Sequence, residues 1–370
     1  MADFSIIDYD NCITNLTSSI QKYYGLEPNY KTLEALDKVM ENKDYDNVVI
    51  ILFDGLGNNI IDLNAKDNNI LKTNRIYRYK STYPPTTANC TTAYLSGLNP
   101  VSTGWLGWST YYRDLDIGVD NFHNLNTLTK EVILGDNIAS YKIPYTPLGK
   151  KIEEFSNGAI KYNTIFPWNL KNRNSLRQFR KKIIKICNSD NKNYMYAYHE
   201  GPDNIMHHEG INSPNVKRKL KQISRSLKII QKKTKNSLFI VCADHGHIDV
   251  NTIALYTYYD VMDCLCAPFT CDARTPFFFV KDDKKDVFPV LFKKYFGDYF
   301  DLYTKDEIIE KKIFGPGKEA PIYRDIIGDF VAIAKSNYYY LLSTRSRIFK
   351  GHHAGLSFDE MSIPLIILEN

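Results

Sequence analysis

Residues 48–55 read Val48-Val49-Ile50-Ile51-Leu52-Phe53-Asp54-Gly55, an apolar run that ends in a carboxylate and a glycine. The run is apolar on both faces and β-branched at its start, which is typical of a parallel strand buried inside a sheet. Residues 237–246 repeat the pattern, with an Asp-His-Gly sequence after the apolar run. In open α/β sheets functional groups gather at the carboxyl ends of the strands. We therefore expect Asp54, Asp244 and His245 to lie at one edge of such a sheet.

The length and composition are those of a globular α/β protein. The chain has 370 residues, 44% of them hydrophobic, which is enough for one large domain with an insertion. A strand-like run at 275–280, followed by a charged segment and a helix-like run at 305–312, predicts a small α/β insertion. We expect this insertion to form part of the wall of the site at the strand ends. We therefore assign residues 1–270 and 331–370 to the core and residues 271–330 to the insertion.

The charge of the chain is weak evidence for a polyanion partner. Lys and Arg total 47 and Asp and Glu total 42, which gives a formal net charge of +5 spread along the chain. The basic stretches 177–185 and 216–235 carry apolar residues three and four positions apart, which predicts amphipathic helices with solvated basic faces. A phosphate-attracting rim is the alternative. The sequence contains no dedicated nucleic-acid-binding motif and specifies no oligomeric state.

The cysteines and the first residues indicate a reducing compartment. The seven cysteines form no CxxC pair, and an odd number does not suit a disulfide framework. Cys264, Cys266 and Cys271 lack a fourth partner at zinc-finger spacing, so we interpret them as structural thiols. The chain opens without the basic and apolar leader of a signal peptide, and no apolar run approaches the roughly 18 residues of a membrane span. We expect a cytoplasmic location and no membrane span.

Two further segments carry side chains that bind metals. Asp203 and His207 follow Pro202, and their four-residue spacing places carboxylate and imidazole on one side of a helical turn. Gly351-His352-His353 adds two imidazoles near the C-terminus. A lone Asp-x-x-x-His match is common by chance, and a lone histidine is more often a surface or core residue than a ligand. It is the ordered set of segments that predicts a two-metal hydrolase site.

A threonine pair follows two prolines in Tyr83-Pro84-Pro85-Thr86-Thr87. The prolines fix an extended entry, and the Thr/Ala-rich run after them predicts a helix that ends at Gly97. Thr86 or Thr87 then lies at the helix N-terminus, where free N–H groups and the helix dipole favour a phosphate. From this segment alone, the hydroxyl is equally well interpreted as a nucleophile or as a helix cap.

With these motifs in this order, the chain resembles the alkaline phosphatase superfamily, and within it the type I phosphodiesterase/nucleotide pyrophosphatase family and its bacterial relatives. The resemblance covers most of the chain and implies an alkaline phosphatase-like α/β fold, with a central, mostly parallel sheet sandwiched by helices. The family's nucleophile turn matches at Thr87, with Thr86 as the nearest rival. Its final Gly-x-His-x-Gly-Leu-Ser motif matches residues 351–357, which selects His353 over His352.

The resemblance also implies two divalent metal ions. One would be held by Asp203, His207 and His353, and the other by Asp54, Asp244, His245 and the Thr87 oxygen. Mixed imidazole and carboxylate ligands favour zinc, with manganese as the alternative. Two such ions about 4 Å apart would activate the nucleophile and stabilise the leaving oxygen. Thr87 would carry the phosphoryl group until water attacks.

One departure from the family bears on the substrate. Nucleotide pyrophosphatases hold a phosphoryl oxygen with an asparagine, and the comparable place here is Trp108. Trp108 is therefore a candidate to stack a base or cover an apolar leaving group, and ordinary packing beneath a loop is the alternative. Arg274, just before the first strand of the predicted insertion, is a second candidate to meet a substrate phosphate. A salt bridge at the base of the insertion is its alternative.

We expect a metal-dependent hydrolase that cleaves phosphodiester or pyrophosphate bonds in small, nucleotide-type substrates through a phospho-threonine intermediate. A phosphomonoesterase, phosphonate hydrolase or phosphomutase of the same superfamily is the alternative. A non-catalytic, metal-stabilised binding protein is more remote, because the chain keeps Thr87 together with every expected ligand. A sulfatase is disfavoured because Cys90 lacks the C-x-P-x-R context that such enzymes need.

Overall fold

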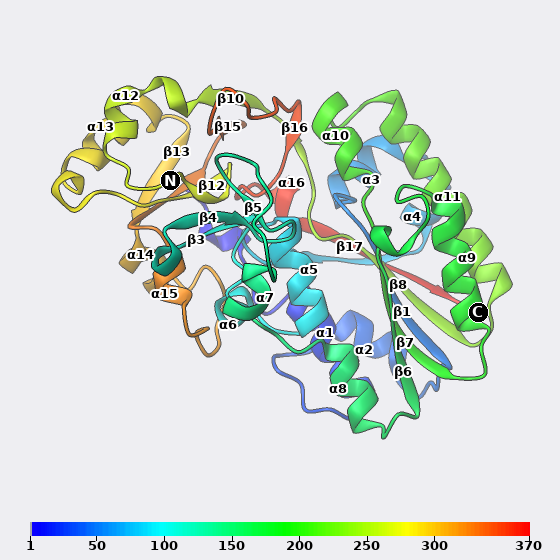
Figure 1. The fold of residues 1–370 in the computed structure, drawn as a ribbon. Helices are drawn as coiled ribbons and strands as arrows, with labels where there is room; N and C mark the ends of the chain where they lie inside the picture. The colour runs from blue at the N-terminus through cyan, green and yellow to red at the C-terminus, as the bar shows by residue number, and fades with distance from the viewer. Residues whose placement is uncertain (1) are drawn as a thin grey trace.

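The structure, a computed structural model, describes residues 2–370 and is built around two sheets (Figure 1). The first sheet has six strands in the order β2-β17-β8-β1-β7-β6. Four neighbours, β8, β1, β7 and β6, run parallel, and β17 is antiparallel to both β8 and β2. The strands are β1 (Asn47–Phe53), β2 (Arg75–Lys80), β6 (Ile160–Ile165), β7 (Lys192–His199), β8 (Ser237–Cys242) and β17 (Ser362–Glu369). The predicted mostly parallel sheet is confirmed.

The centre of this sheet is apolar and closed to water. Every residue of β1 and of β8 is buried, as expected from runs that have no polar face. Their register places Leu52 opposite Cys242, so the two strands end side by side. On the other side of β1, Phe53 pairs with His199 at the end of β7. Three strand ends therefore lie together at one edge.

Helices cover both faces of the first sheet (Figure 1). One face carries α1 (Ile13–Tyr23), α2 (Glu34–Met40), α5 (Thr87–Ser96) and α8 (Leu148–Phe155), and the other carries α3 (Asn58–Asn64), α4 (Ile70–Thr73), α9 (Leu176–Cys187), α10 (Asp203–Glu209) and α11 (Pro214–Lys233). In α11 the buried residues Val216, Leu220, Ile223, Leu227 and Ile230 recur three and four apart. The two predicted amphipathic helices are thus confirmed as α9 and α11.

A second, antiparallel sheet has seven strands in the order β13-β14-β12-β11-β3-β4-β5. They are β3 (Ser109–Tyr112), β4 (Ile117–Asp120), β5 (Leu125–Asn126), β11 (Thr270–Asp272), β12 (Thr275–Phe278), β13 (Phe300–Thr304) and β14 (Phe330–Ala334). The other helices are α6 (Pro100–Thr103), α7 (Ile138–Lys142), α12 (Tyr259–Asp263), α13 (Val287–Phe296), α14 (Lys305–Glu310), α15 (Tyr323–Ile326) and α16 (Phe358–Met361). Two short ladders pair β10 (Asn251–Ala254) with β15 (Tyr338–Leu341) and β9 (Ile248–Asp249) with β16 (Gly351–His352).

The strand and the helix expected within residues 271–330 are present as β12 and α14. A cluster of phenylalanines joins β12 to α13, with Phe278 close to both Phe288 and Phe292. The second sheet also takes in strands from residues 109–126 and from 330–334. The division of the chain at residues 271 and 330 stays a prediction.

In the described residues 2–370, none of the helices combines the length and the apolar character needed to cross a bilayer. All seven cysteines are free thiols, and six of them are buried.

A buried ion pair ties the second sheet to the C-terminal segment. Arg274, just before β12, donates from Nε and Nη2 to the two carboxylate oxygens of Glu360 at 2.7 and 2.9 Å. Its Nη1 donates to the carbonyl oxygen of Tyr338 at 2.7 Å. Burial alone would raise the pKa of Glu360, but the guanidinium of Arg274 holds that pKa below its usual range. The pair therefore remains ionised inside the protein.

Breaking this pair should destabilise the fold. We expect Arg274→Met to lower the free energy of unfolding by about 3–5 kcal/mol, because a buried carboxylate is left without its partner. Adding Glu360→Leu should restore much of the loss. The matched control is the exposed pair of Arg324 with Glu319, where Arg324→Met should leave urea denaturation nearly unchanged. Equal effects of the two arginine substitutions would contradict the argument.

Candidate metal centre and nucleophile

The site is assembled where β1, β7 and β8 end. Asp54 follows β1, Asp203 begins α10 shortly after β7, and Asp244 follows β8. Backbone contacts fix these ends, since the N–H of Asp203 donates to the carbonyl oxygen of Asp54 at 3.0 Å. The N–H of Gly55 donates to Asp244 Oδ1 at 2.9 Å. The three carboxylates are therefore held by adjacent strands of one rigid sheet.

The side chains form two overlapping groups that offer metal-binding atoms. Asp203, His207, His247 and His353 have ligand atoms that all lie within 4.8 Å of one another, and so do Asp54, Asp203 and His245. Asp244 adjoins the second group, with Oδ2 at 3.6 Å from His245 Nε2. All six predicted metal ligands are thus brought to one place. The structure adds His247, which the sequence analysis did not single out.

Backbone carbonyls orient the rings of three histidines. The Nδ1–H of His207 donates to the carbonyl oxygen of Gly351 at 2.9 Å. In the same way, His245 donates to the carbonyl oxygen of Gly246 at 2.9 Å, and His353 donates to that of Pro85 at 3.0 Å. A carbonyl can only accept, so each Nδ1 carries a proton. Each Nε2 is left to face the group, which is the usual arrangement for histidines that bind a metal.

The two threonines have different partners. Thr86 is the N-cap residue of α5 but makes no capping bond with its side chain, and its Oγ1 donates to Asp272 at 2.9 Å instead. Thr87 is the first helical residue, and its Oγ1 lies 3.3 Å from His245 Nε2 and 3.5 Å from Asp54 Oδ1. Neither threonine side chain caps the helix. Thr87, rather than Thr86, lies beside the carboxylates and imidazoles.

The carboxylates and the imidazole of His207 shift one another's pKa values, because they are buried close together. Burial and the charge of Asp203 raise the pKa of Asp54 well above its usual value, and burial and Asp54 do the same to the pKa of Asp244. Burial would lower the pKa of His207, but the carboxylate of Asp203 raises it to about 9. Burial would raise the pKa of Asp203, but His207 holds it well below its usual range. Asp203 and His207 therefore form an ion pair.

The polar atoms of the site also fit divalent cations. Asp203 Oδ1 and Asp244 Oδ2 are buried without a hydrogen-bond partner among the described residues. Buried acceptors left in this state cost free energy unless a proton or a cation satisfies them. Carboxylates and imidazoles together suit zinc or manganese. The residues present therefore fit the ions that the sequence motifs imply.

Trp108 and Arg274 lie outside the metal-binding groups. Trp108 is 36% exposed, and its Nε1 donates to Asp120 Oδ2 at 2.8 Å. Its ring packs on Phe122 and His123. Arg274 is buried in its pair with Glu360, which is the salt bridge that the sequence analysis kept as the alternative. Because its Nε, Nη1 and Nη2 are all engaged, we interpret Arg274 as a support of the C-terminal segment and not as a substrate contact. The substrate contact of Trp108 stays a prediction.

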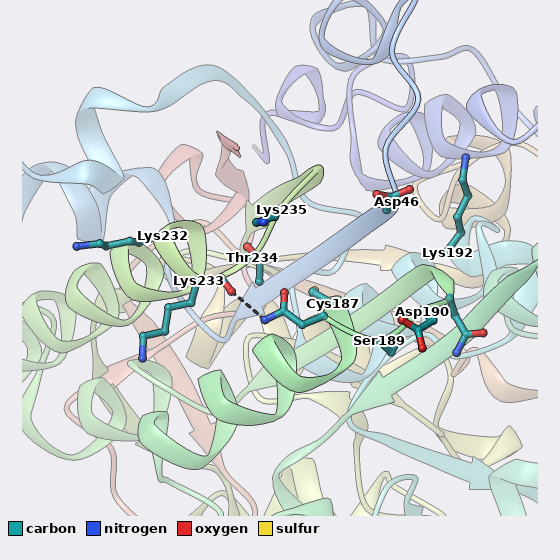
Figure 2. A pocket seen from close by; sticks show the side chains of 11 residues that line it. Asp46, Cys187, Ser189, Asp190, Lys192, Lys232, Lys233, Thr234 and Lys235 are labelled. Carbon is teal, nitrogen blue, oxygen red and sulfur yellow. Dashed lines mark hydrogen bonds between the residues drawn. The ribbon is translucent and has the colours of Figure 1, made fainter.

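A surface hollow of about 690 Å³ lies at the opposite edge of the first sheet (Figure 2). It is lined by Asp46, by residues 187–192 and by residues 232–235, where β1, β7 and β8 begin. None of the predicted site residues borders it. The predicted site residues lie instead at the carboxyl ends of these strands, so the hollow and the candidate site are separate.

Two residues of the site were missed from sequence. His247 follows the Asp-His-Gly motif, and the His-x-His spacing with His245 was the signal for it. Tyr198 is the last residue but one of β7, and its hydroxyl donates to Asp54 Oδ2. Its signal was weak, because β7 contains several tyrosines and only one of them reaches the site.

The chain matches a known family by sequence and known structures by fold. Residues 48–355 match the family model described as type I phosphodiesterase/nucleotide pyrophosphatase. No curated protein matches the chain by sequence. Murine ectonucleotide pyrophosphatase/phosphodiesterase 5 superimposes with a TM-score of 0.67 at 18% identity, over 87% of this chain and 88% of that one. The human protein gives a TM-score of 0.65 at 17% identity, over 86% and 87%. An inactive threonine-to-alanine variant of the murine protein, in complex with AMP, gives 0.64 at 17% identity, over 86% and 87%.

The pKa of His207 leads to a prediction about metal binding. At pH 7 the ring is protonated, because its pKa is raised to about 9, and it must lose that proton to bind a cation. Zinc binding should therefore release at least one proton. The apparent affinity should rise by about tenfold per pH unit for each proton released, until pH passes the pKa of His207.

Calorimetric zinc titration in two buffers of different ionisation enthalpy measures this release. His207→Ala should lower the number of protons released, and substitution of the exposed His208 by alanine should not change it. Heats that are independent of the buffer would contradict the ion pair of His207 with Asp203.

Proposed function

The chain belongs to the type I phosphodiesterase/nucleotide pyrophosphatase family, and from that premise we propose that it hydrolyses phosphodiester or pyrophosphate bonds in nucleotide-type substrates through a phosphorylated Thr87. It is an enzyme of the phosphodiesterase/nucleotide pyrophosphatase type. The metal dependence, the threonine intermediate and the substrate are parts of the proposal. A non-catalytic binding protein is accordingly set aside.

The observation that carries the proposal is the position of Thr87 Oγ1. It lies 3.3 Å from His245 Nε2 and 3.5 Å from Asp54 Oδ1, at the start of a ten-residue helix. The unpaired N–H groups and the positive end of the helix dipole at this point favour a phosphate group. A hydroxyl here is well placed to attack a phosphorus atom bound at the helix N-terminus.

Zinc is the proposed metal, with manganese as the alternative, because the ligands are imidazoles and carboxylates. We assign one ion to Asp203, His207 and His353, and the other to Asp54, Asp244 and His245. Two bound cations would lower the pKa of a nearby hydroxyl and neutralise the charge that develops on a phosphoryl group. Without them, a threonine hydroxyl is too weak an acid to be a nucleophile near neutral pH.

The proposed reaction has two half-reactions. Thr87 Oγ forms a bond to phosphorus while the bond to the leaving oxygen breaks, so the leaving alcohol or phosphate departs and a phospho-threonine diester remains. Water then attacks the same phosphorus, Thr87 regains its hydroxyl, and a phosphate monoester is released. Asp54 and His245 position the Thr87 oxygen in both steps. The hydroxyl of Tyr198, in turn, holds Asp54 in place.

The substrate class rests on the family and on one relative. The murine structure of an inactive threonine-to-alanine variant contains AMP, the kind of nucleoside monophosphate that the proposed reaction would release. Trp108 offers a partly exposed aromatic face for a base or an apolar leaving group. We keep the cytoplasmic location as a prediction that stands apart from this argument.

The nucleophile can be tested by paired substitutions. Thr87→Ala should lower kcat for a diester by roughly 10⁴-fold or more, the scale on which loss of a covalent nucleophile is felt, and Thr87→Ser should retain measurable turnover. The metal content of both variants should match the original protein. Thr86→Ala is the matched control and should keep most of the activity, because it loses only the bond to Asp272. Full activity in Thr87→Ala would move the nucleophile to Thr86 or remove the covalent step.

The preference for diesters can be tested directly. Metal-replete enzyme should cleave bis(4-nitrophenyl) phosphate faster than 4-nitrophenyl phosphate, as judged by kcat/KM, because the predicted site holds no extra group for a second phosphate charge. A chelator should abolish both activities, and added zinc should restore them. A reversed preference would favour a phosphomonoesterase, phosphonate hydrolase or phosphomutase of the same superfamily.

A further inference from the structure

His247 lies inside the Asp203 group although no motif assigns it a role. Its ligand atom falls within 4.8 Å of those of Asp203, His207 and His353. The ring is fully buried, and it packs edge-on against His207 with centroids 4.7 Å apart. His247 therefore shares the space in which the proposed cation of this group would be held.

The protein itself does not satisfy this imidazole. Neither Nδ1 nor Nε2 of His247 has a hydrogen-bond partner among the described residues, and Asp203 Oδ1 has none either. Yet His247 Nε2 and Asp203 Oδ1 lie only 3.2 Å apart. Two buried polar atoms that lie side by side without a hydrogen bond are expected where both face a third group.

The arrangement repeats that of a predicted ligand. His207 Nε2 lies 3.3 Å from Asp203 Oδ2, and His247 Nε2 lies 3.2 Å from the other oxygen of the same carboxylate. Both separations suit neighbouring ligands of one cation whose bonds to nitrogen and oxygen are about 2.0–2.2 Å long. We propose that His247 is a fourth protein ligand of the cation in the Asp203 group. This inference deepens the proposed function and rests on it.

The backbone that carries His247 is held in place. The carbonyl oxygen of His247 accepts a hydrogen bond from Asn59 Nδ2 at 2.7 Å, and the N–H of Gly246 donates to the carbonyl oxygen of Glu360 at 2.8 Å. A Cβ on Gly246 would lie 1.9 Å from the carbonyl oxygen of Asp359, so only glycine permits this approach. On the far side, β9 pairs with β16 directly after His247. The main chain that carries the imidazole is thus positioned before any cation arrives, which lowers the entropic cost of binding one.

The inference makes the two metal positions unequal. The Asp203 group would offer three imidazoles and one carboxylate, whereas the Asp54 group offers one imidazole and carboxylates beside the Thr87 hydroxyl. Four protein ligands complete a tetrahedron around zinc, as in structural sites, and a substrate oxygen would then have to enter as a fifth ligand. We therefore expect the Asp203 group to bind zinc first and more tightly, and the Asp54 group to exchange its ion more readily.

The decisive measurement counts the imidazoles bound directly to metal. Protein labelled with nitrogen-15 at its eight histidines is loaded with two equivalents of cadmium-113, and spin coupling between metal and ring nitrogen is recorded by NMR. Coupling passes only through a direct bond. We expect four coupled Nε2 signals, from His207, His245, His247 and His353, and three in His247→Gln. His208→Gln, one residue beyond His207 and exposed, should leave four.

Each outcome decides a different question. Three coupled signals in the original protein, with His247 uncoupled, would overturn the inference and leave the proposed function intact. No coupled signal at all would overturn both, because the metal centre itself would be absent. The count in the original protein does not depend on whether His247→Gln folds. If that variant folds, its tighter zinc site should weaken by at least about tenfold in a competition titration, with the weaker site unchanged.

Discussion

Three carboxylates are buried together at the ends of three adjacent parallel strands, and the rest of the site depends on what balances their charge. The raised pKa values of Asp54 and Asp244 express the cost of keeping both ionised out of water. Asp203 forms an ion pair with His207, whereas Asp54 and Asp244 share the imidazole of His245. A sheet that collects uncompensated carboxylates at one edge is costly unless it binds cations there. The same positive charge is what a phosphate substrate and a weakly acidic threonine require.

The second sheet and the C-terminal segment complete the group of side chains around the three carboxylates. The segment after β16 carries His353, and contacts with both sheets set its position: Thr275 of β12 donates to the carbonyl oxygen of Ala354, and the N–H of Gly246, just after β8, donates to that of Glu360. Arg274 reaches from the second sheet to Glu360, and Glu360 Oε1 also accepts the N–H of Gly355 at 2.7 Å. The guanidinium that the sequence suggested for the substrate therefore holds the backbone near His353. Any effect of Arg274 on the candidate site would therefore act through the position of His353.

The sequence predicted the parts of this molecule that follow from local pattern. The apolar runs of β1 and β8 predicted buried parallel strands with polar residues at their ends. The order of the motifs then predicted which carboxylates and imidazoles lie close together. What it could not predict depends on tertiary contacts. The sequence cannot tell whether Arg274 binds a phosphate or a carboxylate, because only the fold brings Glu360 next to it. The sequence alone does not distinguish His247 from an ordinary histidine. Only the packed structure shows that its ring nitrogens have no hydrogen-bond partner among the described residues.

The two threonines illustrate how finely the local backbone divides roles between identical side chains. Thr86 has extended backbone angles (φ −130°, ψ 146°) as the N-cap residue, and Thr87 is the first residue of the helix. Successive side chains across such a boundary point in different directions, so one hydroxyl meets Asp272 and the other meets Asp54 and His245. The bond from Thr86 also lowers the pKa of Asp272, which burial raises to about 6 overall. Thr86 therefore ties the start of α5 to the second sheet, whereas the backbone at the start of the helix directs the Thr87 hydroxyl toward Asp54 and His245.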